Sequence, residues 1–482
     1  MHFGLESYVS YALYLGAVAA LLLSVFWRPK VGIYFLLPLI PLQTVRYRMN
    51  DLPLGSSLFG VMLLGVAVGL WRERQTLPPA ARWFRVLGIY AGFTFGSLCL
   101  GSAYLGTSLP LPGDVRFADW REYMIMPAMC LLTAAAVRTK REIQIVILIL
   151  CLGTFLLDKS FWGTVADREF STYSEDLHAD SGAMGYAGTN GLAAFTAEVS
   201  VFLLALAAFE KKIWLRIACY GLAIYSALCL MYSLSRGGYA AFLAGAAVIG
   251  LLKQRKILLL LCLFLLTWTT LVPPAVRQRV EMTYDQQSGE LDHSSETRLS
   301  LWNNALEVFD ANLALGAGFN TYEYMHLNQR TDGGTGYYAD THNYFVKMLV
   351  ETGVIGLLLF LWLLITLLNQ GYRLFRRAQD PLFSALGLGL VGWVACAVVA
   401  NLFGDRWSFL QVNGYMWVIA GLVCRAHALE QTASAATPEG SHPAIATTGF
   451  DDEACGESQP ELAREALESL FADPVSLERR EP

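Results

Sequence analysis

The stretch GVIGLLLFLWLLITLL, residues 353–368, decides the class of fold. It carries no charged residue, and a second run of the same kind, ILLLLCLFLLTWTTLV, occupies residues 257–272. A helix needs about 20 such residues to cross the hydrocarbon core of a bilayer. The whole chain is 55% hydrophobic and 16% charged, whereas about 25% of the residues of a soluble protein are charged. Both observations predict an all-α, polytopic membrane protein.

Apolar segments of this kind recur along most of the chain. We expect a transmembrane helix bundle of 12 to 13 spans, because one of the short early segments can be re-entrant. The expected spans are residues 8–26, 31–45, 55–71, 86–102, 122–137, 142–158, 190–209, 213–232, 237–252, 256–273, 342–369, 382–403 and 408–425. The first has no basic stretch before it, so we interpret it as a span rather than a cleaved signal peptide.

Lysine and arginine gather in every second connection between these segments. Short cytoplasmic connections of membrane proteins are enriched in these residues, so the clusters are expected in the cytoplasm and the other connections outside. Arg46 and Arg48 are the exception, because they fall outside in this scheme. The clusters are Arg28/Lys30, Arg72/Arg74, Arg138/Lys140/Arg141, Lys211/Lys212, Lys253/Arg255/Lys256 and Arg373/Arg376/Arg377.

Two of the outward connections are long, at about residues 158–189 and 273–341. The second contains SSETRLSLWNNALEVFD, in which apolar side chains recur at helical spacing; they are Leu299, Trp302, Leu306 and Phe309. This loop is therefore expected to be partly helical, with an amphipathic helix lying against the membrane or the top of the bundle.

The last part of the chain differs in composition from the rest. Residues 426–482 are rich in Ala, Thr, Pro and acidic residues, which is typical of a disordered tail, here on the cytoplasmic side. We divide the chain into residues 1–184, with the N-terminal spans and the first long outer loop, residues 185–425, a core that includes the loop 273–341, and residues 426–482.

Charge and cysteine content exclude several function classes. The net charge is −5 and no basic face is apparent, so a nucleic-acid partner is not expected. Eight of the nine cysteines lie in or at the ends of apolar spans, without the spacing of a zinc site or a disulfide framework. The loop 273–341 is net acidic, so any site for an anion must be local, at the face of the membrane.

Two arginines on the outer side are candidate functional residues. Arg236, in SLSRGG, stands between two apolar spans, where a charge must be paired, solvated or functional. Arg298 lies one helical turn before Trp302, and a guanidinium binds phosphate oxygens through a planar fork of donors. The alternatives are a guanidinium that reaches the lipid headgroups for Arg236 and a solvated helix residue for Arg298.

A histidine on the same side is the third candidate. His342, in THNYFVKMLVETGVIGLL, stands where the long loop enters a span, with Asn343 beside it as a donor and acceptor. Histidine titrates near neutral pH and is the commonest general base. An interfacial histidine with a satisfied hydrogen bond is the alternative.

The order of these motifs resembles that of the O-antigen ligase and polymerase superfamily. The resemblance rests on Ser-Arg-Gly-Gly between two spans, a long outer loop with Arg298, Trp302 and GAGFNTY, and His-Asn at the entry of a span that continues as ETGVIGLL. GYAGTNGLA, residues 185–193 with Asn190, is a further element. The resemblance covers about residues 185–425.

The resemblance implies a metal-independent, inverting glycosyltransferase of the bacterial inner membrane with no cofactor. Such an enzyme moves a glycan from an undecaprenyl-diphosphate-linked donor to a glycolipid or glycan acceptor, such as the lipid A core, on the periplasmic side. Arg236 and Arg298 would hold the donor diphosphate, and His342 would be the acceptor base. Asn343, Trp302 and Asn190 would be further substrate-binding residues. The bilayer and polysaccharide assembly proteins are the other expected partners.

Other functions remain open. A repeat-unit polymerase for O-antigen or exopolysaccharide shares the donor chemistry of a ligase and differs in its acceptor, and so does an enzyme that glycosylates protein hydroxyls. A transporter would place ionisable groups along a path through the bilayer centre; here Glu198 and Glu351 are the main ones within the spans. A scaffold of a polysaccharide assembly complex, with the tail binding a partner, is the third alternative.

Overall fold

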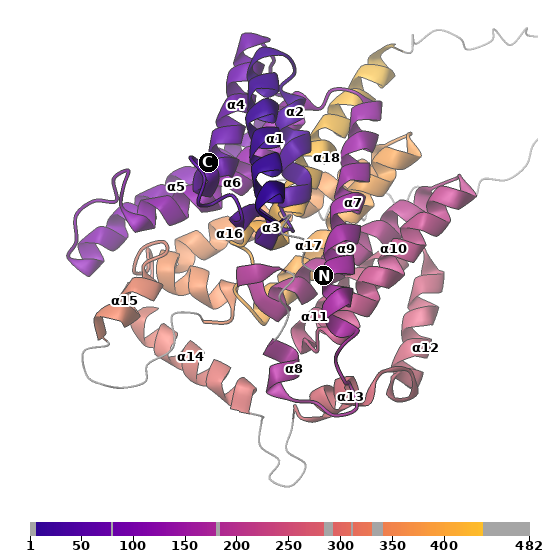
Figure 1. Cartoon of the computed structure of the whole chain (residues 1–482). Coiled ribbons are helices and arrows are strands. Elements are labelled where there is room, and N and C mark those ends of the chain that lie inside the picture. Colours follow the sequence, from indigo (N-terminus) through magenta and orange to yellow (C-terminus); the bar gives the residue numbers. More distant parts are fainter. Residues whose placement is uncertain are drawn as a thin grey trace, which may run out of the picture. The chain divides into compact units, whose positions relative to one another are not determined.

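The computed structural model describes residues 6–78, 81–179, 184–283, 293–309, 312–329 and 341–436. These residues form helices and no β-strand (Figure 1). Met1–Ser434 make up one compact unit, and Ala435–Pro482 are separate from it. The helix α18 continues to Ala436, about ten residues past the expected start of the tail. The predicted disorder of the tail itself lies outside the described residues.

Each predicted span corresponds to a helical segment. The helices are α1 (Glu6–Phe26), α2 (Lys30–Leu36), η1 (Leu37–Leu39), α3 (Gln43–Tyr47), η2 (Gly55–Ser57), α4 (Leu58–Arg72), α5 (Ala81–Leu105), α6 (Val115–Ala136), α7 (Lys140–Val165), α8 (Glu175–Ala179), η3 (Gly185–Ala187), α9 (Gly188–Phe209), α10 (Ile213–Tyr232), α11 (Arg236–Leu252), α12 (Arg255–Leu271), α13 (Pro274–Glu281), α14 (His293–Phe309), α15 (Tyr322–Gln329), α16 (Tyr344–Arg377), α17 (Pro381–Leu402) and α18 (Leu410–Ala436). The all-α polytopic membrane fold is confirmed.

Fewer helices than the expected 12 to 13 are long and apolar enough to cross a membrane. Among the described residues eight qualify, or nine if α12 and α13, bent by 108° where they meet, count as one span. The segment 30–39 and α11 are apolar but short, while α6 and α18 include more polar residues. The expected span 31–45 is broken into α2, η1 and α3, where Pro38 and Pro41 interrupt helical hydrogen bonding.

The long outer connections differ in part from the prediction. The first begins later than expected, because α7 continues to Val165 and buries Asp158. The second contains α13, α14 and α15, so its partly helical character is confirmed. In Figure 1 these helices and α8 lie along the lower side of the unit.

All six basic clusters lie at one end of the bundle, here called the basic end. The contacts that join them are Arg72 to the carbonyls of Phe26 and Trp27, the ion pairs Lys30–Glu142 and Lys140–Asp380, Arg138 to Gln75, the Phe209–Phe375 ring pair, and Lys253 over the Phe209 ring. Arg46 and Arg48 are not among them; they belong to or follow α3, which packs against η3. The alternation read from the sequence therefore corresponds to a real segregation of charge.

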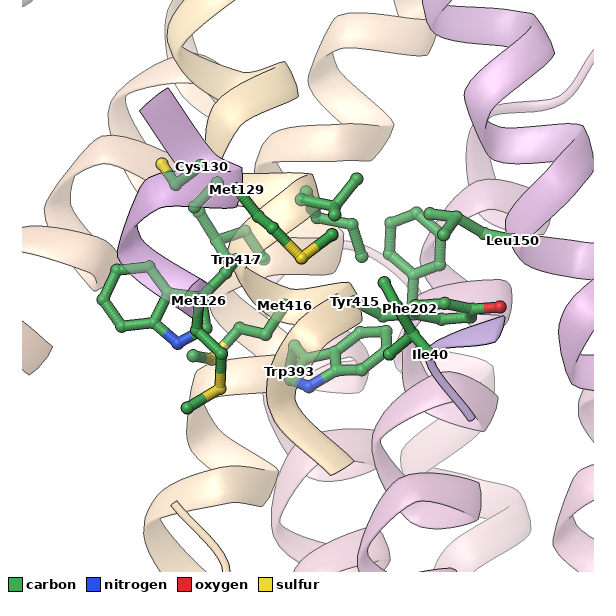
Figure 2. Packing of buried hydrophobic residues seen from close by; sticks show 14 of the residues in the cluster. Ile40, Met126, Met129, Cys130, Leu150, Phe202, Trp393, Tyr415, Met416 and Trp417 are labelled. Atoms are coloured by element: carbon green, nitrogen blue, oxygen red, sulfur yellow. The ribbon is translucent and has the colours of Figure 1, made fainter. Parts of the chain in front are cut away.

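The centre of the bundle is formed by α9 and α17, which pack against each other and against α11. Figure 2 shows the adjoining core, in which aromatic and sulfur-containing side chains from several helices interlock; among them are Met126, Met129, Phe202, Trp393, Tyr415 and Trp417. Beside it, α16 and α17 meet through glycines. A Cβ on Gly387 would lie 2.5 Å from the carbonyl oxygen of Gly371, so small residues permit the close approach.

The helix α16 is broken at Gly353, which has φ +66° and ψ −171°. In an unbroken helix the amides of Val354 and Ile355 would donate to the carbonyls of Val350 and Glu351. Here they donate to Leu313 and Ala314 O at 3.0 and 3.3 Å. The two carbonyls in turn accept from the amides of Ala317 and Gly318, at 2.9 and 2.7 Å. The segment 313–318 thus satisfies the groups that the break exposes.

The exchange of hydrogen bonds at this break predicts that replacing Gly353 destabilises the protein. In Gly353→Ala the Cβ would lie 2.2 Å from the carbonyl oxygen of Ala314 in a left-handed conformation, and we expect a loss of about 2–3 kcal/mol. The thermal unfolding midpoint of the purified protein in detergent measures it. Gly96→Ala on α5 is the control, since nothing lies within 4 Å of its Cβ. Equal midpoints for the two variants would contradict the prediction.

Candidate active site

Four residues singled out in the sequence line a single cavity of about 250 Å³. They are Asn190, Arg236, Arg298 and His342. They come from α9, α11, α14 and the turn before α16. Since they span about 150 positions in the chain, the fold and not local sequence brings them together.

Arg236 is held by the turn between α10 and α11. Leu234 in that turn is buried and has φ +58°, a left-handed conformation that non-glycine residues seldom adopt. The hydroxyl of Ser235 donates to Oδ1 of Asn190 at 2.7 Å. Nη1 of Arg236 donates to Oγ1 of Thr283, which follows α13, at 2.9 Å. Asn190 therefore links the start of α9 to the turn that presents Arg236.

His342 also lies in a left-handed turn, with φ +48°. Residues in strained backbone of this kind cluster at functional sites. Both neighbours are fixed: Thr341 Oγ1 donates to the carbonyl of Asn343 at 2.8 Å, and the carbonyl of Thr341 accepts from Nε1 of Trp302 at 2.9 Å. The amide of Tyr344 donates to the carbonyl of Gly404 at 3.1 Å. These bonds fix the backbone of the turn that carries the imidazole, directly before the first residue of α16.

Asn343 and Trp302 do not line the cavity. Oδ1 of Asn343 accepts from the amides of Phe345 and Val346 at 3.0 and 3.3 Å, so it caps α16. The indole of Trp302 is bonded to the turn at Thr341. The structure thus gives both residues a role in positioning His342, while direct contact with a substrate stays a prediction.

Arg298 reaches the cavity from α14, which packs against α16. The buried side chains of α14 include residues outside the apolar stripe noted in the sequence. Leu301 and Ala305 are buried, whereas Leu299 and Leu306 are 45% and 39% exposed. The helical spacing is correct, but packing against α16 selects a face rotated by part of a turn.

The cavity holds two more arginines that the sequence did not single out, Arg279 and Arg406. Both are buried. Arg279 lies over the ring of Tyr173 at 4.7 Å, with Nη1 3.6 Å from a carboxylate oxygen of Glu175. The amide of Arg406 donates to Oδ1 of Asn401 at 3.0 Å. Arg406 stands between two apolar spans, as Arg236 does, so its position in the sequence could have marked it as a candidate. Arg279 could not be distinguished from the other charged residues of the long outer loop.

Among the residues that the structure describes, four arginines and a single carboxylate, that of Glu175, line the cavity. Such a lining attracts an anion, and a planar guanidinium suits phosphate oxygens. The net acidity of the loop 273–341 does not oppose this, because two of its described arginines, Arg279 and Arg298, line the cavity.

A second histidine, His178 of α8, also lines the cavity. Its Nδ1 lies 3.1 Å from the carbonyl oxygen of Ser233. Since a carbonyl can only accept, Nδ1 carries the hydrogen and Nε2 keeps a lone pair. Burial lowers the pKa of His178 from its usual 6.5; the Ser233 bond opposes this shift, while Arg279 and Arg236 add to it. The lowered pKa favours the neutral form of the imidazole.

Comparison with known proteins gives two similarities. Residues 221–361 match the family described as O-antigen ligase, a range that includes Arg236, Arg298 and His342. The chain is also 28% identical over 263 residues to the exopolysaccharide production protein ExoQ of Rhizobium meliloti (strain 1021). That similarity covers 48% of this chain and 57% of the relative, somewhat over half its length.

The fold and cavity define a multi-pass membrane protein with a cationic site at one end of its bundle. Over residues 221–361 and in its similarity to ExoQ, the chain resembles the O-antigen ligase and polymerase superfamily.

The cap on α16 gives a test of Asn343. Asn343→Ala removes the acceptor for two amides and should destabilise the protein by about 1 kcal/mol, measured as a lower unfolding midpoint. Asn343→Asp keeps an acceptor oxygen and should unfold near the wild-type temperature. A substrate-binding role instead of a cap would appear as lost activity in Asn343→Asp together with an unchanged midpoint in Asn343→Ala.

Proposed function

We propose that this protein transfers a glycan from an undecaprenyl-diphosphate-linked donor to an acceptor sugar hydroxyl at the periplasmic face of the bacterial inner membrane, as an O-antigen ligase does. The observation that carries the proposal is the convergence of Arg236, Arg298 and His342 on one cavity. The family match over residues 221–361 supports it.

The leaving group explains the need for guanidinium groups. When the bond between the anomeric carbon and the phosphate oxygen breaks, its electron pair stays on the diphosphate, which gains negative charge. Donors already in place stabilise that charge in the transition state. Arg236 and Arg298 are assigned to this role, and Arg279 and Arg406 add positive potential from the same lining.

The acceptor needs a base. As its oxygen attacks the anomeric carbon from the side opposite the leaving diphosphate, its proton passes to the imidazole of His342, and a single displacement inverts the anomeric configuration. Hydrogen bonds between Thr341 and Asn343 fix the turn that carries this ring. Neutral His178, across the same lining, offers Nε2 as an acceptor for a further sugar hydroxyl.

His342→Ala should lower the rate of transfer by about 10²–10⁴-fold, the usual contribution of a general base, with little change in expression. The rate is measured with purified protein in proteoliposomes containing donor and acceptor only. His427→Ala is the control, since His427 contacts the Gln370 carbonyl near the basic end. Near-normal transfer by His342→Ala would remove the base assignment.

Arg298→Ala should reduce transfer by about 10²–10³-fold, because a donor for the developing charge is lost, and Arg298→Lys should restore only part of it, because lysine lacks the planar fork. Arg277→Ala is the matched control; Arg277 lies on α13, is half exposed and faces Glu281. Equal losses in Arg277→Ala and Arg298→Ala would indicate a general effect of charge.

A repeat-unit polymerase is the second candidate function. The similarity to a protein named for exopolysaccharide production supports it. Deletion of the gene separates the two. Loss of attachment with accumulation of long lipid-linked polymer supports a ligase, whereas single repeat units on the acceptor support a polymerase. Transfer by the purified, reconstituted protein would exclude the transporter and the scaffold.

A further inference from the structure

A second cavity, of about 390 Å³, lies between α5 and α16 near the basic end. We call it the lateral groove. Its lining comes from one turn of α5 and about three turns of α16; the residues are Arg85, Val86, Ile89, Trp362, Ile365, Thr366, Asn369, Gln370 and Arg373. It shares no residue with the cavity that holds His342.

The α16 residues of the lateral groove form one continuous stripe. Positions 362, 365, 366, 369, 370 and 373 are spaced by three and one in turn. That spacing places all six on one face of a helix. The groove therefore runs lengthwise along α16, parallel to the direction in which that helix crosses the membrane.

Polarity changes along this stripe. The end toward the basic clusters carries the amides of Asn369 and Gln370 and the guanidinium of Arg373, with Arg85 opposite. Eleven residues away, about 16 Å at 1.5 Å per residue, the lining is Trp362. None of the described residues that line the groove is acidic.

The deeper part of the groove is apolar and faces outward. Ile89, Trp362 and Ile365 are 48%, 41% and 60% exposed, and both helices qualify as membrane spans. Their surroundings are therefore acyl chains. An occupant must combine an anionic polar head with an apolar chain about 16 Å long, which describes a phospholipid.

We propose that the lateral groove binds one anionic phospholipid of the leaflet at the basic end. Its phosphate and headgroup lie between Arg85 and Arg373, and one acyl chain follows Ile365 and Trp362 along α16. Basic pockets between transmembrane helices on the cytoplasmic side bind anionic headgroups in this way. The inference is independent of the proposed function, because it uses neither the outer cavity nor its chemistry.

The test uses full-length protein in nanodiscs, with bound lipid counted by native mass spectrometry. With equal amounts of phosphatidylglycerol and phosphatidylcholine, the wild type should retain phosphatidylglycerol at least fivefold better. Arg85→Ala/Arg373→Ala should lose this preference. Arg376→Ala/Arg377→Ala, which removes the same charge from the same end but outside the groove, should keep it.

Ile365→Trp supplies a second test without a change of charge, since it fills the apolar part of the groove. It should reduce retained phosphatidylglycerol by a similar factor. Equal retention of the two lipids, equal losses in the two double-arginine variants, or preferential displacement by a polyprenyl phosphate would each overturn the proposal.

Discussion

Inside a membrane every backbone amide and carbonyl needs a partner within the protein, because the lipid offers none. The break of α16 at Gly353 is where this constraint shapes the molecule most directly. The carbonyls of Val350 and Glu351 and the amides of Val354 and Ile355 lose their helical partners and regain them from the segment 313–318. The outer loop is thereby joined to the membrane helix by four reciprocal hydrogen bonds.

The hydrogen bonds between the segment 313–318 and α16 involve residues on both sides of the break. Asn320 donates its amide to a carboxylate oxygen of the buried Glu351 at 2.9 Å, which extends the contact. The short stretch of α16 before the break directly follows the turn with His342, and Asn343 caps it. Two sequence motifs, GAGFNTY and ETGVIGLL, are thus the two halves of one contact, which positions the imidazole.

Electrostatics gives the two ends of the bundle different roles. At the basic end the positive charges are spread over many connections and are partly matched by Glu142 and Asp380. At the other end four guanidinium groups converge on one cavity. Like charges brought close together repel one another. An anionic ligand relieves that repulsion, so the arrangement is better suited to binding than to stability.

Most of the helices could be predicted from the sequence, since uncharged apolar runs have few alternatives in a membrane protein. The prediction failed where a local feature overrides the apolar pattern: Pro38 and Pro41 break the segment 31–45, and α7 continues past Asp158 because that carboxylate is buried with Ser226 at its side. Spacing alone does not say which stripe of an amphipathic helix meets a partner, and on α14 it is Leu301 and Ala305 that are buried.

The sequence by itself determined the membrane class, the alternation of basic connections, and Arg236, Arg298 and His342 as residues of interest. Only the tertiary structure decided that these three meet, that Arg279, Arg406 and His178 join them, and that Trp302 and Asn343 bond to the turn around His342. The reason is physical. Apolar spans and basic connections can be recognised in the local sequence, because each side chain prefers lipid or water by its own chemistry. The convergence of the site residues depends instead on how helices far apart in the chain pack.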